Sequence, residues 1–124
     1  MSDAPYHAHI YYQEGERAAA KLLRERLAGM PEHVGFVGRM TWEAVGPHPI
    51  PQFEIHFVEA SLPALLPVIE ASHLRALIPP LTDDDLADHT ILGQWLGEPV
   101  PLDLSVLDPP GQNKGVARFG KSDF

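Results

Sequence analysis

Two short segments with strict alternation of polarity constrain the fold of this chain most strongly. Residues 6–12 read YHAHIYY and residues 53–58 read FEIHFV, so two histidines alternate with apolar residues in the first segment, and a glutamate and a histidine do so in the second. Successive side chains of a β-strand point to opposite faces of the sheet. Each segment is therefore expected to form a strand with one apolar face and one face that carries imidazole or carboxylate groups.

The order of the periodic segments predicts the fold class. Apolar residues with helical spacing occur at 17–28 and 62–71, the second of which contains Pro67, and further strands are expected at 34–45 and 74–78. The order strand, helix, strand, strand, helix, strand is typical of a ferredoxin-like split βαβ sandwich of the α+β class. In that topology the first and third strands are central neighbours, and the fourth strand lies beside the first.

The C-terminal part of the chain predicts an addition to this core. Thr82 and the three aspartates that follow it favour a helix start, because a hydroxyl cap and early carboxylates complement the exposed amide end. We expect an additional helix at 83–96 and an additional strand at 100–107. Residues 1–107 would then form a single domain, and the polar residues 108–124 are predicted to be a mobile tail.

Composition excludes several classes of function. The 124 residues contain no cysteine, so disulfides, thiolate zinc sites and cysteine nucleophiles are absent. A net charge of −8 argues against nucleic acid or an anionic membrane as the main partner. The N-terminal residues lack a signal-peptide pattern and no segment is long and apolar enough to span a membrane, so we expect a soluble cytoplasmic protein that binds small molecules or proteins.

The polar face of the two alternating strands is the first candidate site. If the helices cover the apolar face, the opposite face carries His7, His9, Tyr11, Glu54 and His56. Side chains two positions apart on a strand stand roughly 7 Å apart, close enough to share a metal ion or one ligand. Imidazole and carboxylate ligands suit iron(II), manganese or zinc. The alternative is that these histidines are solvated on an edge strand or an open sheet face, or lie in a dimer interface.

A proline-rich loop is expected to hold another histidine close to this face. Residues 46–51 read GPHPIP, and three prolines in so short a segment exclude a paired strand or a helix interior. The stiffness of this loop restricts His48 to a limited set of positions.

One further histidine is expected on the C-terminal helix. Asp85 and His89 are one helical turn apart on the same face, a spacing that allows a carboxylate to orient an imidazole. The alternative is that the carboxylates only complement the dipole of the first turn and that His89 has no role.

Taken together, these motifs resemble the DOPA 4,5-dioxygenase family. The segments that carry the resemblance are HAHIY at 7–11, GPHP at 46–49, LTDDDLADHT at 81–90, WLG at 95–97 and LDLS at 102–105. The likeness extends over nearly all of the chain except its tail. It implies a small ferredoxin-like fold, often assembled as a homodimer, and extradiol cleavage of a catechol such as DOPA by dioxygen.

The resemblance also implies roles for individual residues. The histidines that match the family are His7, His9, His48 and His89. In the expected mechanism, His7, His9 and a third ligand hold iron(II), with zinc or manganese as alternatives, while His48 and His89 move protons. Tyr11 and Glu54 would line the substrate pocket.

One position departs from the family pattern. The family usually has a histidine before the acidic helix start, and this chain has Pro79 there, which can neither ligate a metal nor move a proton. We hypothesise that His56 replaces that histidine as a metal ligand. The alternative function is a non-catalytic, dimeric, ferredoxin-like protein that binds a small ligand and has lost turnover because of Pro79.

Overall fold

A computed structural model, which describes residues 3–120, shows a five-stranded antiparallel sheet in the order β2-β3-β1-β4-β5. The strands are β1 (Pro5–Tyr11), β2 (Phe36–Val37), β3 (Gln52–Val58), β4 (Ala76–Ile78) and β5 (Gln94–Leu96). The α-helices are α1 (Arg17–Ala28), α2 (Leu62–Ala71) and α3 (Asp85–His89). The ferredoxin-like α+β fold is confirmed, because β1 and β3 are central neighbours and β4 lies beside β1.

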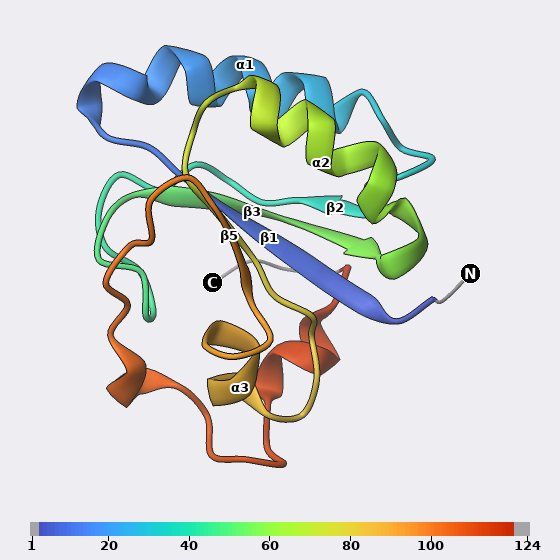
Figure 1. The fold of residues 1–124 in the computed structure, drawn as a ribbon, viewed down its shortest axis with the longest axis vertical. Helices are drawn as coiled ribbons and strands as arrows, with labels where there is room; N and C mark the ends of the chain where they lie inside the picture. Colours follow the sequence, from blue (N-terminus) through green and yellow to red (C-terminus); the bar gives the residue numbers. More distant parts are fainter. Residues whose placement is uncertain (1–2, 121–124) are drawn as a thin grey trace.

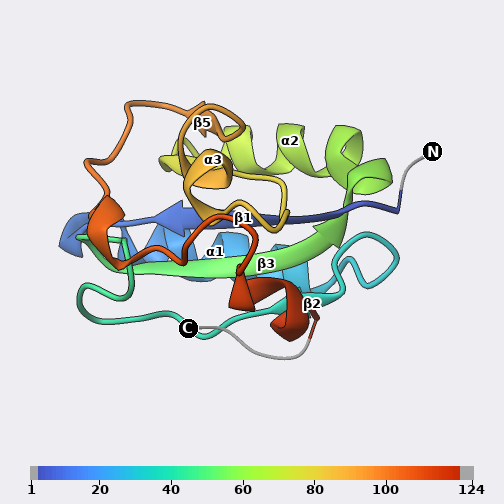
Figure 2. The same ribbon diagram turned by 90° about the horizontal axis from the view of Figure 1, so that it is seen from below.

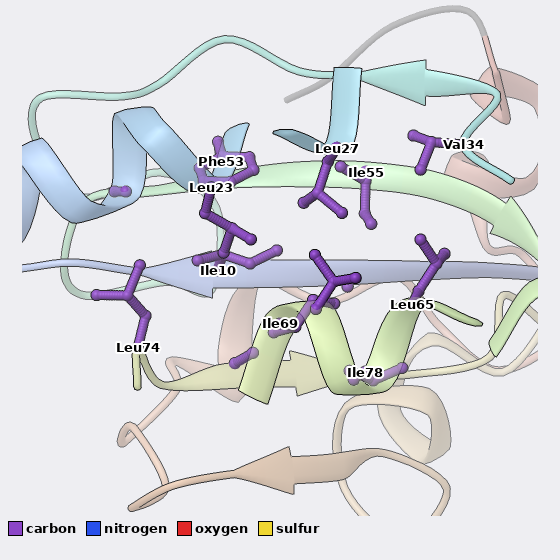
Figure 3. Close-up of a cluster of buried hydrophobic side chains, with 14 of the residues drawn as sticks. Ile10, Leu23, Leu27, Val34, Phe53, Ile55, Leu65, Ile69, Leu74 and Ile78 are labelled. Atoms are coloured by element: carbon purple, nitrogen blue, oxygen red, sulfur yellow. The ribbon is translucent and has the colours of Figure 1, made fainter. Parts of the chain in front are cut away.

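Helices α1 and α2 lie on one face of the sheet and enclose the main hydrophobic core (Figure 1). Alternation along β1 and β3 places Ile10 and Ile55 on this face, and both side chains are fully buried. Figure 3 shows them facing Leu23 and Leu27 of α1 and Ile69 of α2. The core therefore uses the apolar half of each alternating strand, which leaves the polar half for the opposite face.

The bounds predicted for the two long helices are confirmed. Helix α1 ends at Gly29, whose N–H still donates to the carbonyl oxygens of the last turn, and Pro31 follows. Helix α2 accommodates Pro67 within its ten residues. That proline does not stop the helix, because Val68 and Ile69 beyond it are buried against the sheet and packing stabilises the last turn.

The strand expected at 34–45 is mostly wrong, since only Phe36–Val37 are regular strand. The backbone nitrogens of Gly35, Gly38 and Thr41 donate to the carbonyl oxygens of His56, Glu54 and Gln52, respectively. The edge segment thus advances three residues for every two residues of β3. Such a mismatch is typical of repeated β-bulges, which Gly35 and Gly38 tolerate. The bulges prevent a continuous ladder of hydrogen bonds along this edge.

The helix expected at 83–96 is also wrong in its extent. Helix α3 ends at His89, and Gln94–Leu96 form β5 instead, paired with β4. The chain reverses through Gly93, where a Cβ atom would lie 2.8 Å from both the carbonyl oxygen of Asp88 and Cδ1 of Leu77. Only glycine fits this close approach. Gly93 therefore permits the chain reversal between α3 and β5, and α3 ends before it.

The strand expected at 100–107 is not formed; this segment contains a short 3₁₀ helix at Leu104–Val106. Prolines at positions 99 and 101 and the Asp103 side-chain cap on the N–H of Ser105 favour a turn over a ladder. The additional helix and strand are nevertheless present, as α3 and β5.

The chain after α3 crosses the face of the sheet opposite α1 and α2, as seen from below in Figure 2. Within the predicted tail, Asn113 donates to the carbonyl oxygen of Thr82, and residues Lys114–Arg118 form a 3₁₀ helix. The tail residues 121–124 lie outside the described residues. The second face of the sheet is therefore covered as well.

Among residues 3–120, no helix combines the length and the apolar character that crossing a membrane requires.

Candidate active site

Five of the seven histidines gather on the sheet face that α3 covers. The site consists of His7, His9, His48, His56 and His89 around the carboxylate of Glu54. Each of these side chains is buried, and His9 and Glu54 are only 0% and 1% exposed. The alternative of solvated histidines on an open sheet face is therefore wrong, because the C-terminal addition shields this face from water.

The strands and loops that carry these residues explain their convergence. Antiparallel pairing of β1 with β3 sets His7 opposite His56 and His9 opposite Glu54. The proline-rich loop brings His48 beside His9, with ring centroids 4.2 Å apart. Helix α3, on the side of the sheet opposite α1 and α2, carries His89, whose ring centroid is 5.8 Å from that of His9.

Three of the histidines have their Nδ1 atoms held by acceptor groups. Nδ1 of His7 lies 3.3 Å from Oε2 of Glu54, and Nδ1 of His9 lies 3.1 Å from Oε1 of Gln52. Nδ1 of His89 lies 2.8 Å from the carbonyl oxygen of Asp85. Carboxylate and carbonyl oxygens only accept hydrogen bonds, so each Nδ1 carries a proton and each Nε2 keeps a lone pair when the ring is neutral.

This arrangement is suited to a metal ion. One potential ligand atom from each of His7, His9 and His89 lies within 4.8 Å of the other two. Nε2 of His7 is buried and has no hydrogen-bond partner among the described residues. A lone pair that is buried without a donor is costly unless a ligand or ion uses it. The donor set, neutral imidazole with each outer nitrogen anchored, is the usual arrangement around protein-bound transition metals.

Glu54 lies between three of the imidazoles. Its Oε2 is 3.3 Å from Nδ1 of His7 and 3.7 Å from Nδ1 of His9, while its Oε1 is 3.5 Å from Nε2 of His56. Burial alone would raise the pKa of Glu54, but the hydrogen bonds from His56 and His7 outweigh burial and hold the pKa at about 2. The site therefore contains a fixed negative charge that orients the histidines.

Burial separates the histidines into two groups. Loss of solvation lowers the pKa of His7 and of His9 and lowers the pKa of His48 to about 3, so these rings are neutral near pH 7. Burial also lowers the pKa of His89, but Asp85, with Oδ1 3.2 Å from Nδ1, outweighs this effect and raises it above its ordinary value. His89, at the edge of the site, is therefore easier to protonate than His7, His9 and His48 at its centre.

His56 has a different environment from the other histidines. The backbone N–H of Gly120 donates to its Nδ1 at 2.7 Å, and the ring of Phe119 stacks on it with centroids 5.5 Å apart. When Nδ1 accepts a hydrogen bond, the proton of the neutral ring is on Nε2, which faces Glu54. His56 also belongs to a second group of potential ligand atoms, with His7 and Glu54. Its use as a ligand requires the C-terminal segment to release Nδ1 or the ring to lose its proton from Nε2.

Pro79 lies directly beside this site. Pairing of His9 with Leu77 across β1 and β4 continues to His7 and Pro79, where the N–H of His7 donates to the carbonyl oxygen of Pro79. Directly opposed residues project to the same face of a sheet, so a side chain at position 79 belongs to the histidine face. Pro79 itself is buried.

A small cavity adjoins the histidines on the outer side of His89. It has a volume of about 250 Å³ and is lined by His89, Thr90, Trp95, Pro99, Val100, Leu102 and Leu104. Trp95 stacks on Tyr11, with ring centroids 5.8 Å apart, and Tyr11 in turn shares a 2.7 Å hydrogen bond with Nδ1 of His48. The cavity is mainly apolar and has an imidazole at its inner wall, as expected of a site for a small ring.

The structure brings together every site residue expected from the sequence and adds others that the sequence reasoning missed. Gln52 anchors His9, and its position on β3, two residues before Glu54, could have identified it by alternation. Phe119 and Gly120 contact His56 from a segment that was expected to be only a polar tail. No local pattern marks a backbone N–H as the partner of a distant imidazole. His33 and His73 lie outside the cluster.

Comparisons with known proteins identify relatives of this chain. The chain is 30% identical over 111 residues to the DOPA 4,5-dioxygenase of Amanita muscaria, a match that covers 82% of this chain and 49% of that protein. It therefore spans about half the length of the Amanita protein. It is 32% identical over 123 residues to an uncharacterised 21.2 kDa protein of Botryotinia fuckeliana, covering 90% of this chain and 67% of that protein.

A solved structure and a family model complete the comparison. The crystal structure of a candidate dioxygenase from Nostoc punctiforme PCC 73102 superimposes with a TM-score of 0.74 at 28% identity, covering 83% of this chain and 90% of that chain. The model of the Dopa 4,5-dioxygenase family matches residues 6–106, which include all five clustered histidines. The chain thus belongs to the Dopa 4,5-dioxygenase family.

Proposed function

We propose that this protein is a metal-dependent dioxygenase that opens the ring of a small catechol such as DOPA by extradiol cleavage. The observation that carries the proposal is the convergence of His7, His9 and His89, whose potential ligand atoms lie within 4.8 Å of one another. Family membership supports the same reaction class, and the name of the Amanita relative supports the substrate class.

In this proposal Nε2 of each of the three histidines holds the metal, because each Nδ1 is already used by Glu54, Gln52 or Asp85. A redox-active ion such as iron(II) suits a site of imidazoles with open positions, and zinc and manganese fit the same donors. When bound, the ion supplies the electron-transfer chemistry by which both atoms of dioxygen enter the ring-opened product. His89 takes the role of third ligand here, in place of the proton transfer that the sequence suggested. The ligand role of His56 stays a prediction.

His48 and Tyr11 are proposed to handle protons. Burial raises the pKa of Tyr11, so its hydroxyl keeps its proton and donates to Nδ1 of His48. The neutral His48 ring then holds its own proton on Nε2, which is buried and has no acceptor among residues 3–120. The Nε2–H of His48, beside the ring of His9, can donate a hydrogen bond to a substrate oxygen while the Tyr11 hydroxyl holds the ring in this tautomer.

The cavity outside His89 is proposed to admit the substrate ring. It is open to the surface and lined mainly by apolar side chains, so one face of a small ring could lie against it. Trp95 and Val100 offer apolar surface to a ring, and His89 at the wall would place the ring beside the proposed metal site. The layer formed by α3 and the C-terminal segment excludes water from the histidines, which strengthens each electrostatic contact inside.

A second candidate function rests on Pro79. Because position 79 faces the same side of the sheet as His7, replacing a family histidine by proline removes one polar group from the site itself. We therefore propose, as the second candidate function, a homodimeric protein that binds the small ligand without turnover.

Anaerobic iron(II) loading followed by a catechol assay separates the two functions. The dioxygenase proposal predicts bound iron and, after admission of air, ring-cleaved product with a new near-ultraviolet absorbance and one dioxygen consumed per catechol. Tight catechol binding by calorimetry without oxygen consumption would favour the non-catalytic function. Absence of both iron and catechol binding would contradict both proposals.

A further inference from the structure

A second cavity lies away from the histidines, between α1 and the segment that follows β2. It has a volume of about 470 Å³ and shares no lining residue with the candidate active site. Its walls are formed by Arg17, Lys21, Arg24 and Glu25 of α1 and by Arg39, Met40 and Trp42 of the later segment. We refer to this cavity as the basic groove. Nothing in the proposed dioxygenase reaction uses it.

The charge of the basic groove is opposite to that of the protein. The chain has only nine lysines and arginines and a net charge of −8, yet four of those nine basic residues line this one cavity with a single glutamate. Four cations around one concavity repel each other, and this repulsion is relieved when an anion lies between them. The groove therefore presents a local positive potential on an acidic molecule.

Arg17 provides an unused hydrogen-bond donor at this groove. Its guanidinium carbon lies 3.6 Å from the ring centroid of Trp42 and 5.8 Å from that of Tyr12. Its Nη1 is buried, and none of the described residues accepts a hydrogen bond from it. A buried guanidinium N–H without an acceptor is costly, and an anion is the acceptor that arginine binds most strongly.

A neighbouring arginine is held in place by the backbone. Nε of Arg24 donates to the carbonyl oxygen of Gly38 at 2.7 Å, and the side chain is half-buried. This hydrogen bond fixes the plane of the guanidinium, so less conformational entropy is lost when its terminal N–H groups bind a ligand. The groove is thus partly preorganised.

The rim of the groove carries an aromatic surface. Trp42 is 73% exposed, although its ring already stacks with Arg17 on one side. Exposure of a large aromatic side chain beside fixed cations is typical of surfaces on which a planar ring stacks. Met40 adds a flexible apolar wall.

We propose that the basic groove binds a small aromatic phosphate of about mononucleotide size. The ring would stack on Trp42, and the phosphate would lie among Arg17, Arg24 and Arg39. A phosphate group carries close to two negative charges at neutral pH and accepts bidentate hydrogen bonds from arginine, which matches the excess of cations better than a single carboxylate does. The cavity volume is within the range of small-molecule sites. The proposal does not rest on the dioxygenase activity.

Isothermal titration calorimetry of the full chain with adenosine diphosphate, inorganic pyrophosphate and adenosine tests this proposal. We expect saturable binding of adenosine diphosphate, at least tenfold weaker binding of pyrophosphate, and no measurable binding of adenosine. Quenching of tryptophan fluorescence by adenosine diphosphate should be lost in Trp42→Ala. The variant Arg17→Gln should weaken binding at least tenfold.

Arg26→Gln is the matched control, because Arg26 is an exposed arginine of α1 that does not line the basic groove. Its affinity should equal that of the unaltered protein. Absence of saturable adenosine diphosphate binding would overturn the proposal, as would equal losses in Arg17→Gln and Arg26→Gln. Equal affinity for pyrophosphate and adenosine diphosphate would overturn the proposal that the aromatic ring of the ligand stacks on Trp42. Because Trp42 is 73% exposed, Trp42→Ala is expected to fold, although it also removes the ring on which Arg17 stacks.

Discussion

His7 and Pro79 lie opposite each other, joined by a 3.2 Å hydrogen bond from the backbone N–H of His7 to the carbonyl oxygen of Pro79. Position 79 is therefore on the histidine face, next to a proposed metal ligand. A histidine there would add a nitrogen to the site without removing any existing one. The change Pro79→His is a direct test of whether the proline limits the chemistry.

We expect Pro79→His to bind iron(II) at least tenfold more tightly than the unaltered protein, because an additional imidazole near His7 can complete or support the coordination. Anaerobic calorimetry with iron(II) measures this affinity. Pro79→Leu is the control, since it removes the proline constraint without adding a nitrogen. Equal affinities of the histidine and leucine variants would show that position 79 does not reach the metal.

Asp85 is predicted to act through His89. Its Oδ1 lies 3.2 Å from Nδ1 of His89, and its Oδ2 accepts the N–H of Asp108 at 2.9 Å. Asp85→Asn removes the charge that orients and polarises the imidazole, and such a loss typically lowers metal affinity by about 10–100-fold. The exposed neighbour Asp83 provides the control variant Asp83→Asn. An unchanged iron affinity in Asp85→Asn would rule out His89 as an oriented ligand.

The sequence predicted the central strands β1 and β3 and most of the site because alternation is a local property. Period-two spacing at 6–12 and 53–58 was sufficient to place His7, His9, Glu54 and His56 on one face, and the register of β1 with β3 then follows from burial of the opposite face. Stiffness of the proline-rich loop correctly indicated that His48 would join them.

The remaining features depend on contacts between distant parts of the chain. The early end of α3 results from the approach of Gly93 to Leu77, and the irregular edge at β2 results from a three-to-two mismatch with β3. Neither is encoded in a short window of sequence. The hydrogen bond from Gly120 to His56 comes from a backbone N–H, which every residue except proline can offer.

Acidification is predicted to destabilise the fold through His48. Burial lowers its folded pKa from 6.5 to about 3, so the unfolded chain binds a proton that the folded chain does not between these values. The stabilisation is fully present above pH 6.5 and is lost as the pH falls toward 3, at up to about 1.4 kcal/mol per pH unit. Burial also lowers the pKa of His7 and of His9, which add to the same slope, whereas the ordinary value of 4.5 for Glu54 confines its effect to lower pH. Urea unfolding between pH 4.5 and 6.5 measures the slope.

The matched variant for this slope is His48→Gln. It removes the titrating imidazole, so the dependence of the free energy of unfolding on pH should become shallower by about 1.4 kcal/mol per unit in the same window. A slope identical to that of the unaltered protein would mean that His48 is not buried in its neutral form.

Gly93 is predicted to be essential for the reversal between α3 and β5. A methyl group in Gly93→Ala would be 2.8 Å from the carbonyl oxygen of Asp88, a backbone atom that cannot move without disturbing the end of α3. We expect a loss of about 1–3 kcal/mol in the free energy of unfolding. In Gly15→Ala, the new methyl group meets nothing within 4 Å, so the change should be within about 0.5 kcal/mol. Chemical denaturation of both variants gives the comparison, and equal stabilities would contradict the close approach.

The central claim is that His7, His9 and His89 hold one metal ion together. Its most direct test is the iron content per chain after anaerobic loading and desalting, measured by mass spectrometry for the unaltered protein and for His7→Ala, His9→Ala, His89→Ala and His56→Ala. His33→Ala is the control, because His33 contacts Ser61 outside the cluster. If these three side chains hold the ion, we expect close to one iron per chain in the unaltered protein and in His33→Ala, and at least a tenfold loss in each of the first three variants. Full iron content in His89→Ala together with its loss in His56→Ala would contradict the claim and assign the ion to His7, Glu54 and His56 instead.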